Sequence, residues 1–319
     1  MTPRLALLGT GLAARLHSAA LRRVAPQVPR WYASREPARA REMAAKHGGA
    51  GHFSSYEQAL ASPDITAVVV ALPPALHLEW ALNALAAGKH VVVDKPPFLT
   101  SADFHEAERA AASAGRQLMV AENYFYKPIA ALLRQQITQG ALGDVRFLQI
   151  NALKRQATGD WRDEPGLAGG GALFEGGIHW ISLLANVGLT PIAADAVRVA
   201  REPGLDRSVL VTLRYAEGAA ATLSYSWELG GPVNGVRWSR VYGTAATLRF
   251  ETNGVLAVRV GRRPRMFLPG LADLTGYRAM WLDFLAAIAD NRAPAYGPAA
   301  RRDLRLVEAA CSSLNRSHD

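Results

Sequence analysis

The stretch Leu5-Ala6-Leu7-Leu8-Gly9-Thr10-Gly11-Leu12-Ala13-Ala14 decides the fold of the amino-terminal half. Its apolar beginning predicts a buried strand, and the glycines that follow open a helix in the pattern G-x-G-x-x-A. Gly9 permits a tight turn, Gly11 lets a pyrophosphate come close to the backbone, and Ala14 allows close packing of helix on strand. The helix start offers free N–H groups and a positive dipole end to an anion. We therefore expect a dinucleotide site contacted by Gly9, Thr10, Gly11, Leu12 and Ala13.

Strand-like and helix-like segments alternate as far as residue 121. The strand-like runs are 4–8, 30–33, 67–72, 90–93 and 117–121, and the helix-like segments are 12–24, 38–47, 75–87 and 102–114. This alternation predicts βαβ units and an α/β fold with a doubly wound parallel sheet.

After Glu122 the pattern changes to that of an α+β domain. A predicted helix at 128–138 leads into strand-like runs at 145–153, 196–200, 209–215, 220–227, 238–242 and 255–260. Turn signals such as Asn253-Gly254 are typical of hairpins. One helix, 177–187, interrupts the strands, and two more, near 277–290 and 298–314, close the chain. We expect two domains, 1–121 and 122–319, the second built on a large, mostly antiparallel sheet, with closing helices that could pack back on the first.

Composition narrows the class of protein. The net charge is +9, but the arginines are scattered and accompany no nucleic-acid-binding motif, so an arginine-rich proteome is the favoured explanation and no nucleic-acid partner is expected. With one cysteine, Cys311, no intramolecular disulfide can form. The first apolar run is too short for a signal peptide or a membrane span. These features predict a cytoplasmic protein without a membrane or metal requirement.

The end of the second strand bears on cofactor choice. Ser34 and Arg35 stand where an NAD-preferring site usually carries an acidic residue, and Arg39 follows one helical turn later. A hydroxyl and guanidinium groups suit a 2′-phosphate, which favours NADP(H) over NAD(H). The alternative is that Ser34 caps a turn and the arginines form a solvated face.

Lys95 is unusual because the chain has 31 Arg and only 5 Lys. It ends the run Val91-Val92-Val93-Asp94-Lys95-Pro96, at the carboxyl end of a predicted strand, where ligands bind in open α/β sheets. A lysine there offers a compact amine whose pKa can shift. The alternative is a surface lysine before a turn.

A third signal is the glycine-rich segment that ends in Glu175-Gly176-Gly177-Ile178-His179. If a helix begins near Glu175, the carboxylate and the imidazole share one face, and the carboxylate can orient the ring and raise its pKa for proton transfer. An ordinary helix hydrogen bond is the alternative. Gly176 and Gly177 each weaken a helix by about 1 kcal/mol, which suggests a reason such as close approach of a ligand.

Several motifs in order resemble one known family. They are G-x-G-x-x-A, Leu72-Pro73-Pro74-Ala75-Leu76-His77, Gly88-Lys89-His90 through Pro96, Trp161-Arg162, and Gly169-Gly170-Gly171 through His179. This set is similar to the glucose-fructose oxidoreductase / inositol dehydrogenase (Gfo/Idh/MocA) family over nearly the whole chain.

The resemblance implies an amino-terminal Rossmann domain, a second domain whose open sheet forms a homodimer or homotetramer, and NAD(P)-dependent chemistry on sugar or cyclitol alcohols. It implies that Lys95, before a cis bond to Pro96, contacts the reacting hydroxyl and the nicotinamide ribose. His179 corresponds to the acid/base histidine and Glu175 to the aspartate before it. Further cofactor contacts fall on Leu72, Pro73, His77 and Asp94.

Four residues depart from the family pattern. Asp94 replaces the usual Glu, Glu175 the usual Asp, Leu72 a common Thr, and Ser182 a frequent Asp. The two acidic exchanges keep the charge and change its reach by one methylene, whereas Ser182 puts substrate contacts in doubt.

Polar and aromatic residues near the start of the second domain are candidate walls of a substrate pocket. They are Asn123, Tyr124, Tyr126, Lys154, Arg155, Trp161 and Arg162. Aromatic faces suit sugar rings, although such residues could equally belong to the core. Two other functions stay open: a cofactor-retaining glycosidase or lyase, and a non-catalytic NAD(P)-binding regulatory protein. Lys95 and His179 argue against the regulatory protein, and Ser34-Arg35 against tightly recycled NAD.

Overall fold

The computed structural model describes residues 2–199, 204–230, 236–271 and 273–316. The chain divides into two compact units, residues 1–122 with 277–301 and residues 123–276 with 302–319. The helix α11 (Gly297–Arg316) begins in the first unit and ends in the second.

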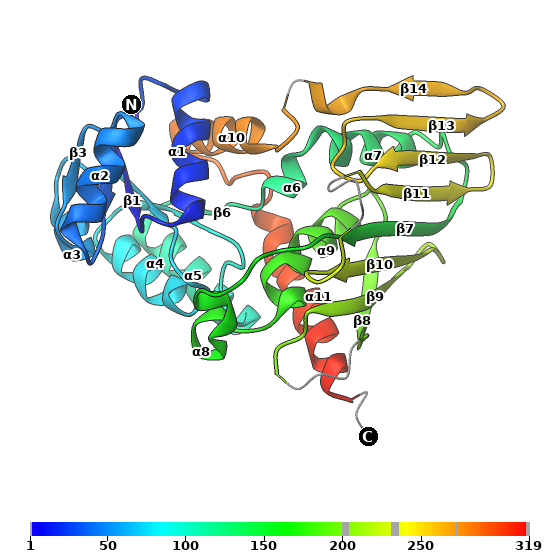
Figure 1. Ribbon diagram of the computed structural model, residues 1–319. Coiled ribbons are helices and arrows are strands. Elements are labelled where there is room, and N and C mark those ends of the chain that lie inside the picture. Colours follow the sequence, from blue (N-terminus) through cyan, green and yellow to red (C-terminus); the bar gives the residue numbers. More distant parts are fainter. Residues whose placement is uncertain (1, 200–203, 231–235, 272, 317–319) are drawn as a thin grey trace. The chain divides into compact units, whose positions relative to one another are not determined.

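The first unit contains a six-stranded parallel sheet in the order β3-β2-β1-β4-β5-β6 (Figure 1). Its strands are β1 (Leu5–Leu8), β2 (Arg30–Ala33), β3 (Gly51–Phe53), β4 (Ala67–Val70), β5 (His90–Val93) and β6 (Leu118–Val120). Every pair is parallel, with Leu5 opposite both Arg30 and Ala67. The predicted doubly wound parallel sheet is confirmed.

Helices pack around this sheet and bury its apolar side chains. They are α1 (Leu12–Val24), α2 (Pro37–His47), α3 (Tyr56–Ala61), α4 (His77–Ala86), α5 (Ser101–Ala114) and α10 (Tyr277–Ala289). The helix α1 packs against α2 and α10, and α4 packs against α5. All residues of β1 and β4 are buried, as expected for strands covered on both faces.

The second unit contains an eight-stranded sheet in the order β14-β13-β12-β11-β7-β10-β9-β8 (Figure 1). Its strands are β7 (Val145–Leu153), β8 (Pro191–Arg198), β9 (Ser208–Tyr215), β10 (Ala220–Ser226), β11 (Trp238–Gly243), β12 (Ala246–Glu251), β13 (Ala257–Gly261) and β14 (Arg265–Phe267). Only the pair β7 and β10 is parallel among these strands. The predicted large, mostly antiparallel sheet is confirmed.

One face of this sheet is covered by helices. They are α7 (Pro128–Thr138), α9 (Ile178–Ala185) and α11, with the short α6 (Asn123–Tyr126) preceding α7. The Tyr215 hydroxyl donates to the Leu184 carbonyl of α9, and the Ser313 hydroxyl of α11 donates to the Ala196 carbonyl of β8. The other face leaves large apolar side chains exposed, such as Phe147 and Leu210.

Several short elements were not anticipated from the sequence. These are β3, α3, β12 and β14. The strand expected at 196–200 begins earlier, at Pro191, and is described as far as Arg198, while Ala200 lies outside the described residues. No helix in the described part of the chain combines the length and apolarity needed to span a bilayer.

Candidate active site

The turn between β1 and α1 has the geometry of an anion cradle. Gly9 has φ +106°, and a Cβ there would collide with the Ala71 carbonyl, so the turn requires glycine. Gly11 is the N-cap of α1, so no side chain of the N-cap residue accepts a hydrogen bond from the first N–H groups of the helix. A Cβ built on Gly11 would meet nothing within 4 Å. The helix start therefore leaves open space beside N–H groups that carry the positive end of the dipole, which fits a dinucleotide pyrophosphate.

The loop after β2 contains an acidic residue that the sequence interpretation did not weigh. The mostly buried Ser34 hydroxyl accepts the Glu36 N–H at 3.2 Å, and the Glu36 carboxylate pairs with Arg39 at 2.9 Å. Arg35 is exposed and close to Tyr56, where its charge opposes the rise that burial causes in the pKa of Tyr56. The loop thus presents two guanidinium groups, that of Arg35, which contacts Tyr56, and that of Arg39, which Glu36 partly neutralises.

His77 ties two loops of the first unit together. Its ring is fully buried, with Nε2 2.7 Å from the Leu72 carbonyl oxygen and Nδ1 2.9 Å from that of Pro96. Burial lowers the pKa of His77, while Asp94 and the carbonyl oxygens oppose that shift. These contacts hold the loop after β4 against the loop after β5. His77 therefore fixes the backbone next to Lys95, which lies in the second of these loops.

Asp94 and Lys95 follow β5, and the peptide bond from Lys95 to Pro96 is cis, which confirms the prediction from the resemblance. The Asp94 carboxylate lies 3.5 Å from Nε2 of His17, a fully buried residue of α1. Burial tends to raise the pKa of Asp94, but the neighbouring His17, Lys95 and His77 outweigh burial and hold that pKa below its usual value. Asp94 is therefore an anion beside Lys95 at neutral pH.

His17 was not identified from the sequence. Its ring packs edge-on against Tyr277 and Trp281 of α10, with centroid distances of 5.4 and 5.5 Å. The available signal was its spacing, because Ala14, His17 and Leu21 recur at helical intervals on one buried face. A histidine on such a face needs a polar partner, and Asp94 is the nearest ionised one.

In the second unit, Glu175 lies in a π-helical turn, Leu173–Gly177, directly before α9. The α-helical i, i+4 geometry assumed from the sequence therefore does not describe Glu175 and His179. Glu175 is 4% exposed and pairs with Nε of Arg162 at 3.1 Å. Arg162 also contacts Asp160 at 2.6 Å and lies 4.4 Å over the Trp161 ring. A short 3-10 turn, Trp161–Asp163, thus brings a guanidinium to the buried carboxylate.

The ring of His179 stacks on Tyr124 of α6, with centroids 4.3 Å apart and planes 16° apart. Tyr124 is itself bracketed by Trp180, edge-on at 5.0 Å, and by the Lys127 ammonium, 4.3 Å above its ring. His179 is only partly buried, so the imidazole is both held in place and accessible. Lys127 is 4% exposed and was also missed from the sequence, although a lysine that soon follows two tyrosines is a cation–π signal.

The glycines around Glu175 have a different reason from the one suggested by the sequence. A Cβ on Gly176 would overlap the Tyr225 hydroxyl, and one on Gly171 would overlap the buried Asp206. The Asp206 carboxylate accepts the Leu173 N–H at 2.8 Å, and burial raises its pKa. These glycines make room for the protein's own side chains, so they are not by themselves evidence of a ligand.

The remaining substrate candidates differ in their surroundings. The Asn123 amide is buried and donates to the Thr275 carbonyl at 2.6 Å. Tyr126 packs edge-on against Phe125, and Lys154, like Arg155, is exposed after β7. Asn123 therefore has a clear structural role, whereas Trp161, Arg162 and Tyr124 cluster around Glu175 and His179. Lys95 and the cofactor candidates belong to the first unit, and Glu175, His179 and the substrate candidates belong to the second.

Comparison with known proteins agrees with this geometry. Residues 4–122 match the GFO_IDH_MocA model, an oxidoreductase family with an NAD-binding Rossmann fold, and residues 130–249 match the GFO/IDH/MocA C-terminal domain. The dTDP-3,4-didehydro-2,6-dideoxy-alpha-D-glucose 3-reductase of Saccharopolyspora spinosa is 30% identical over 241 residues, which cover 70% of this chain and 71% of that enzyme. The chain belongs to the Gfo/Idh/MocA oxidoreductase family.

Solved structures share the Gfo/Idh/MocA fold along the whole chain. Levoglucosan dehydrogenase in complex with NADH and levoglucosan has a TM-score of 0.86 at 23% identity, covering 99% of this chain and 98% of that one. KijD10, a 3-ketoreductase from Actinomadura kijaniata in complex with NADP and TDP-benzene, has a TM-score of 0.85 at 22% identity, with 98% of each chain covered. The chain spans between 58% and 61% of the length of three other curated relatives.

Proposed function

We propose that this protein is an NAD(P)-dependent oxidoreductase that moves a hydride between nicotinamide and a CH–OH carbon of a sugar, cyclitol or related polyol or keto-sugar. The observation that carries the proposal is His179, an accessible imidazole fixed by stacking on Tyr124. A titratable group held in one orientation and open to a ligand suits general acid/base catalysis. A dinucleotide bound at the Gly9 turn supplies the hydride acceptor or donor.

In this proposal His179 takes the hydroxyl proton during oxidation and returns it during reduction. Glu175, held by Arg162, keeps negative charge near the base of α9 and orients His179. Lys95 donates a hydrogen bond to the oxygen on which negative charge develops. The charge of Asp94 attracts the ammonium of Lys95, and His77 fixes the backbone that carries Lys95 through its contact with the Pro96 carbonyl.

The substrate pocket is proposed to use the side chains near His179. Tyr124 and Trp161 offer flat faces to a sugar ring, and Arg162 offers donors to hydroxyl oxygens. Tyr126 and Lys154 are proposed as outer walls, and Asn123 supports the backbone through Thr275. Relatives named for levoglucosan and for a deoxy-keto-sugar nucleotide favour a sugar-like substrate.

For the cofactor we favour NADP(H), because Arg35 is an exposed guanidinium at the end of β2 and Ser34 stands where an acid would bind a ribose diol. Glu36 is the feature that argues for NAD(H), although its carboxylate is engaged by Arg39. Solved relatives bind NADH in one case and NADP in another.

The open face of the eight-stranded sheet is proposed as the contact of a homodimer or homotetramer. Phe147, Leu210 and Met266 are 58%, 40% and 65% exposed on this unit. Large exposed apolar side chains on one sheet face are typical of subunit contacts. Light scattering of the wild type and of a Phe147→Glu variant tests this, because the variant should shift the mass toward one chain.

The function is tested by titrating NADPH and NADH by fluorescence and then screening sugars, inositols and keto-sugars at 340 nm. His179→Ala should lower kcat by about 10²–10⁴-fold and leave NADPH affinity unchanged. His52→Ala, which removes an exposed histidine of β3, is the matched control and should keep normal turnover.

A His179→Ala variant with wild-type turnover would contradict the role of this residue. Nicotinamide that copurifies with the protein and shows no net turnover of free cofactor would favour a glycosidase or lyase instead. Cofactor binding without any turnover would favour a regulatory protein.

A further inference from the structure

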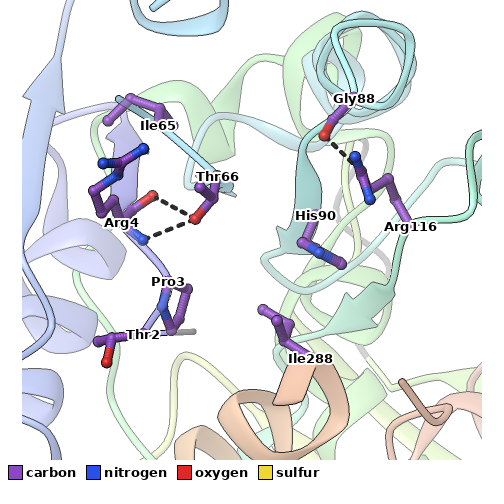
Figure 2. Close-up of a pocket in the computed structure, with 9 residues that line it drawn as sticks. All are labelled: Thr2, Pro3, Arg4, Ile65, Thr66, Gly88, His90, Arg116 and Ile288. Carbon is purple, nitrogen blue, oxygen red and sulfur yellow. Dashed lines mark hydrogen bonds between the residues drawn. The ribbon is translucent and has the colours of Figure 1, made fainter. Parts of the chain in front are cut away.

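A cavity lies at the amino-terminal edge of the six-stranded sheet. It has a volume of about 430 Å³ and is lined by Thr2, Pro3, Arg4, Ile65, Thr66, Gly88, His90, Arg116 and Ile288. Figure 2 shows Arg4 and Thr66 on one side, His90 and Arg116 on the other, and Ile288 of α10 between them. Strands β1, β4, β5 and β6 begin here, whereas the Gly9 turn lies at their carboxyl ends. The cavity is therefore distinct from the proposed nucleotide site.

The polar lining of this cavity is cationic. Arg4 and Arg116 contribute guanidinium groups, and no Asp or Glu is among the nine lining residues. Lys89 is buried just behind, with its ammonium donating to the carbonyls of Ser62 and Ile65. Burial lowers the pKa of Lys89, and the charges of Arg116 and Arg4 add to the effect. Arg116 and Arg4 thus both lie close enough to Lys89 for their charges to act on it.

These guanidinium groups are poorly neutralised by the protein. The Nε of Arg116 donates to the Gly88 carbonyl at 2.6 Å, but among the described residues no carboxylate lies within ion-pair distance of Arg116. The Arg4 guanidinium lies 3.7 Å from the exposed Asp64 and donates to the Pro63 carbonyl at 3.1 Å, while its buried Nε has no hydrogen-bond partner within the described ranges. An anion in the cavity would supply an opposite charge and hydrogen-bond acceptors to the Arg116 guanidinium.

His90 adds a neutral donor. Its Nδ1 accepts the Gln117 N–H at 3.0 Å, which places the ring proton on Nε2. Burial lowers the pKa of His90 and the charge of Arg116 adds to that shift, so the ring stays neutral at pH 7. The Thr2 hydroxyl, on an exposed residue, is a further donor at the rim.

The rest of the lining is apolar. Ile65 is 1% exposed, and Pro3 and Ile288 complete a hydrocarbon wall. A volume near 430 Å³ is within the range of small-molecule sites, roughly 300–1,000 Å³. An inorganic ion would fill only the cationic part and would leave the wall in contact with water.

We propose that this cavity binds a small organic anion, a phosphate monoester or a carboxylate with a short apolar chain. The charged group lies against Arg116 and Arg4, and the chain lies against Ile65 and Ile288. Since the lining comes from the first residues, the sheet edge and α10, the ligand joins segments that are far apart in the sequence and stabilises the first unit.

Calorimetric titrations with butyl phosphate and hexanoate, at constant ionic strength and with saturating NADPH present, test the proposal. At least one of the two probes should bind saturably, and inorganic phosphate and butanol should bind about tenfold more weakly or not at all. Thr2→Glu adds a negative charge at the rim and should weaken binding of the anionic probe by about tenfold or more, because like charges repel each other. Thr2→Gln is the matched uncharged control and should bind as the wild type does.

Two further variants locate the site. Arg116→Gln should weaken the probe at least as much as Thr2→Glu, while Arg109→Gln, which removes an exposed charge from α5, should not. Ile288→Ala should weaken butyl phosphate more than inorganic phosphate. The proposal is wrong if neither probe saturates, if NADPH displaces the probe, or if Thr2→Glu and Thr2→Gln bind it equally well.

Discussion

Two glycine-containing segments, residues 9–11 in the first unit and 169–177 in the second, sit next to the residues proposed for cofactor binding and for proton transfer. At Gly11 the space where a side chain would stand is empty within 4 Å. At Gly176 and Gly171 the same space is filled, by Tyr225 and Asp206. Glycine therefore leaves open space beside the backbone in the first segment and makes room for dense internal packing in the second.

One aspartate from each unit shows a similar contrast in the direction of its pKa. Asp94 has its pKa held low by His17, Lys95 and His77, so the first unit keeps a charge. Asp206 has its pKa raised by burial, with backbone N–H groups as its partners. The first region is organised around charges that can meet a ligand, and the second around close packing that positions one imidazole.

The largest expected effect comes from filling the space at Gly176. Gly176→Ala should destabilise the second unit by about 1–3 kcal/mol, because its Cβ would overlap the Tyr225 hydroxyl. In a Tyr225→Phe background the same substitution should cost less, since the overlapping oxygen is gone. Urea unfolding of the four proteins measures this coupling, and strictly additive effects would show that Tyr225 is not the obstacle.

Gly11→Ala should have the opposite profile. Because nothing lies near its Cβ, unfolding should change by less than about 1 kcal/mol, as for an N-cap exchange. NADPH affinity should fall by about tenfold, or ~1.4 kcal/mol, since the methyl group stands where the pyrophosphate approaches. Fluorescence titration alongside thermal unfolding separates the two effects, and unchanged NADPH affinity would remove the pyrophosphate from this turn.

The acids should give opposite pH dependences. The folded pKa of Asp94 is lowered, so its contribution to stability is present above the unfolded value of about 3.9 and is lost as pH falls through the folded value. The folded pKa of Asp206 is raised, so its contribution is present below about 3.9 and is lost as pH rises through the folded value.

A tenfold change in a proton-binding constant corresponds to about 1.4 kcal/mol. The stability difference between wild type and Asp94→Asn should therefore shrink as pH falls from 7 toward about 3.5, while that between wild type and Asp206→Asn should grow. Urea unfolding across this range measures both series. Parallel curves for the two variants would contradict the contrast between the units.

The smallest effect is a labelling rate at Cys311, in the part of α11 that belongs to the second unit. Burial raises the pKa of this thiol to about 12, so iodoacetamide at pH 8 should modify the folded protein slowly. Gly176→Ala should speed the reaction by loosening the second unit, and Gly11→Ala should not. Equal rates in both variants, followed by mass spectrometry, would mean that the two segments do not differ in this way.

Local patterns predicted the parts of the fold that depend on near neighbours. The helix α7 has the predicted bounds 128–138, and the closing helices fall within two residues or so of α10 and α11, because apolar spacing and capping act within a few turns. The elements β3 and β14 have only three residues each, too few for a period to show. In β12, Thr247 and Arg249 alternate with buried residues over a run too short to distinguish from a loop.

The sequence predicted which residues belong to the candidate site but not which of them contact one another. Motif spacing singled out Lys95, Glu175 and His179, but the pairing of Glu175 with Arg162 and the stacking of His179 on Tyr124 join distant segments. The π-helical turn at 173–177 also changes how Glu175 is presented, and no spacing rule signals such a turn. His17 was hidden because a buried histidine on a helix face looks like any other core position.

The discontinuity of the first unit has a consequence for synthesis on the ribosome. The helix α1 is translated early, but Tyr277 and Trp281, which cover His17, follow only after residues 123–276 of the second unit. At about 5–20 residues per second, this interval lasts roughly ten to thirty seconds. Throughout it the nascent α1 presents an uncovered apolar stripe to solvent, so a chaperone that binds emerging chains would find a target in this helix.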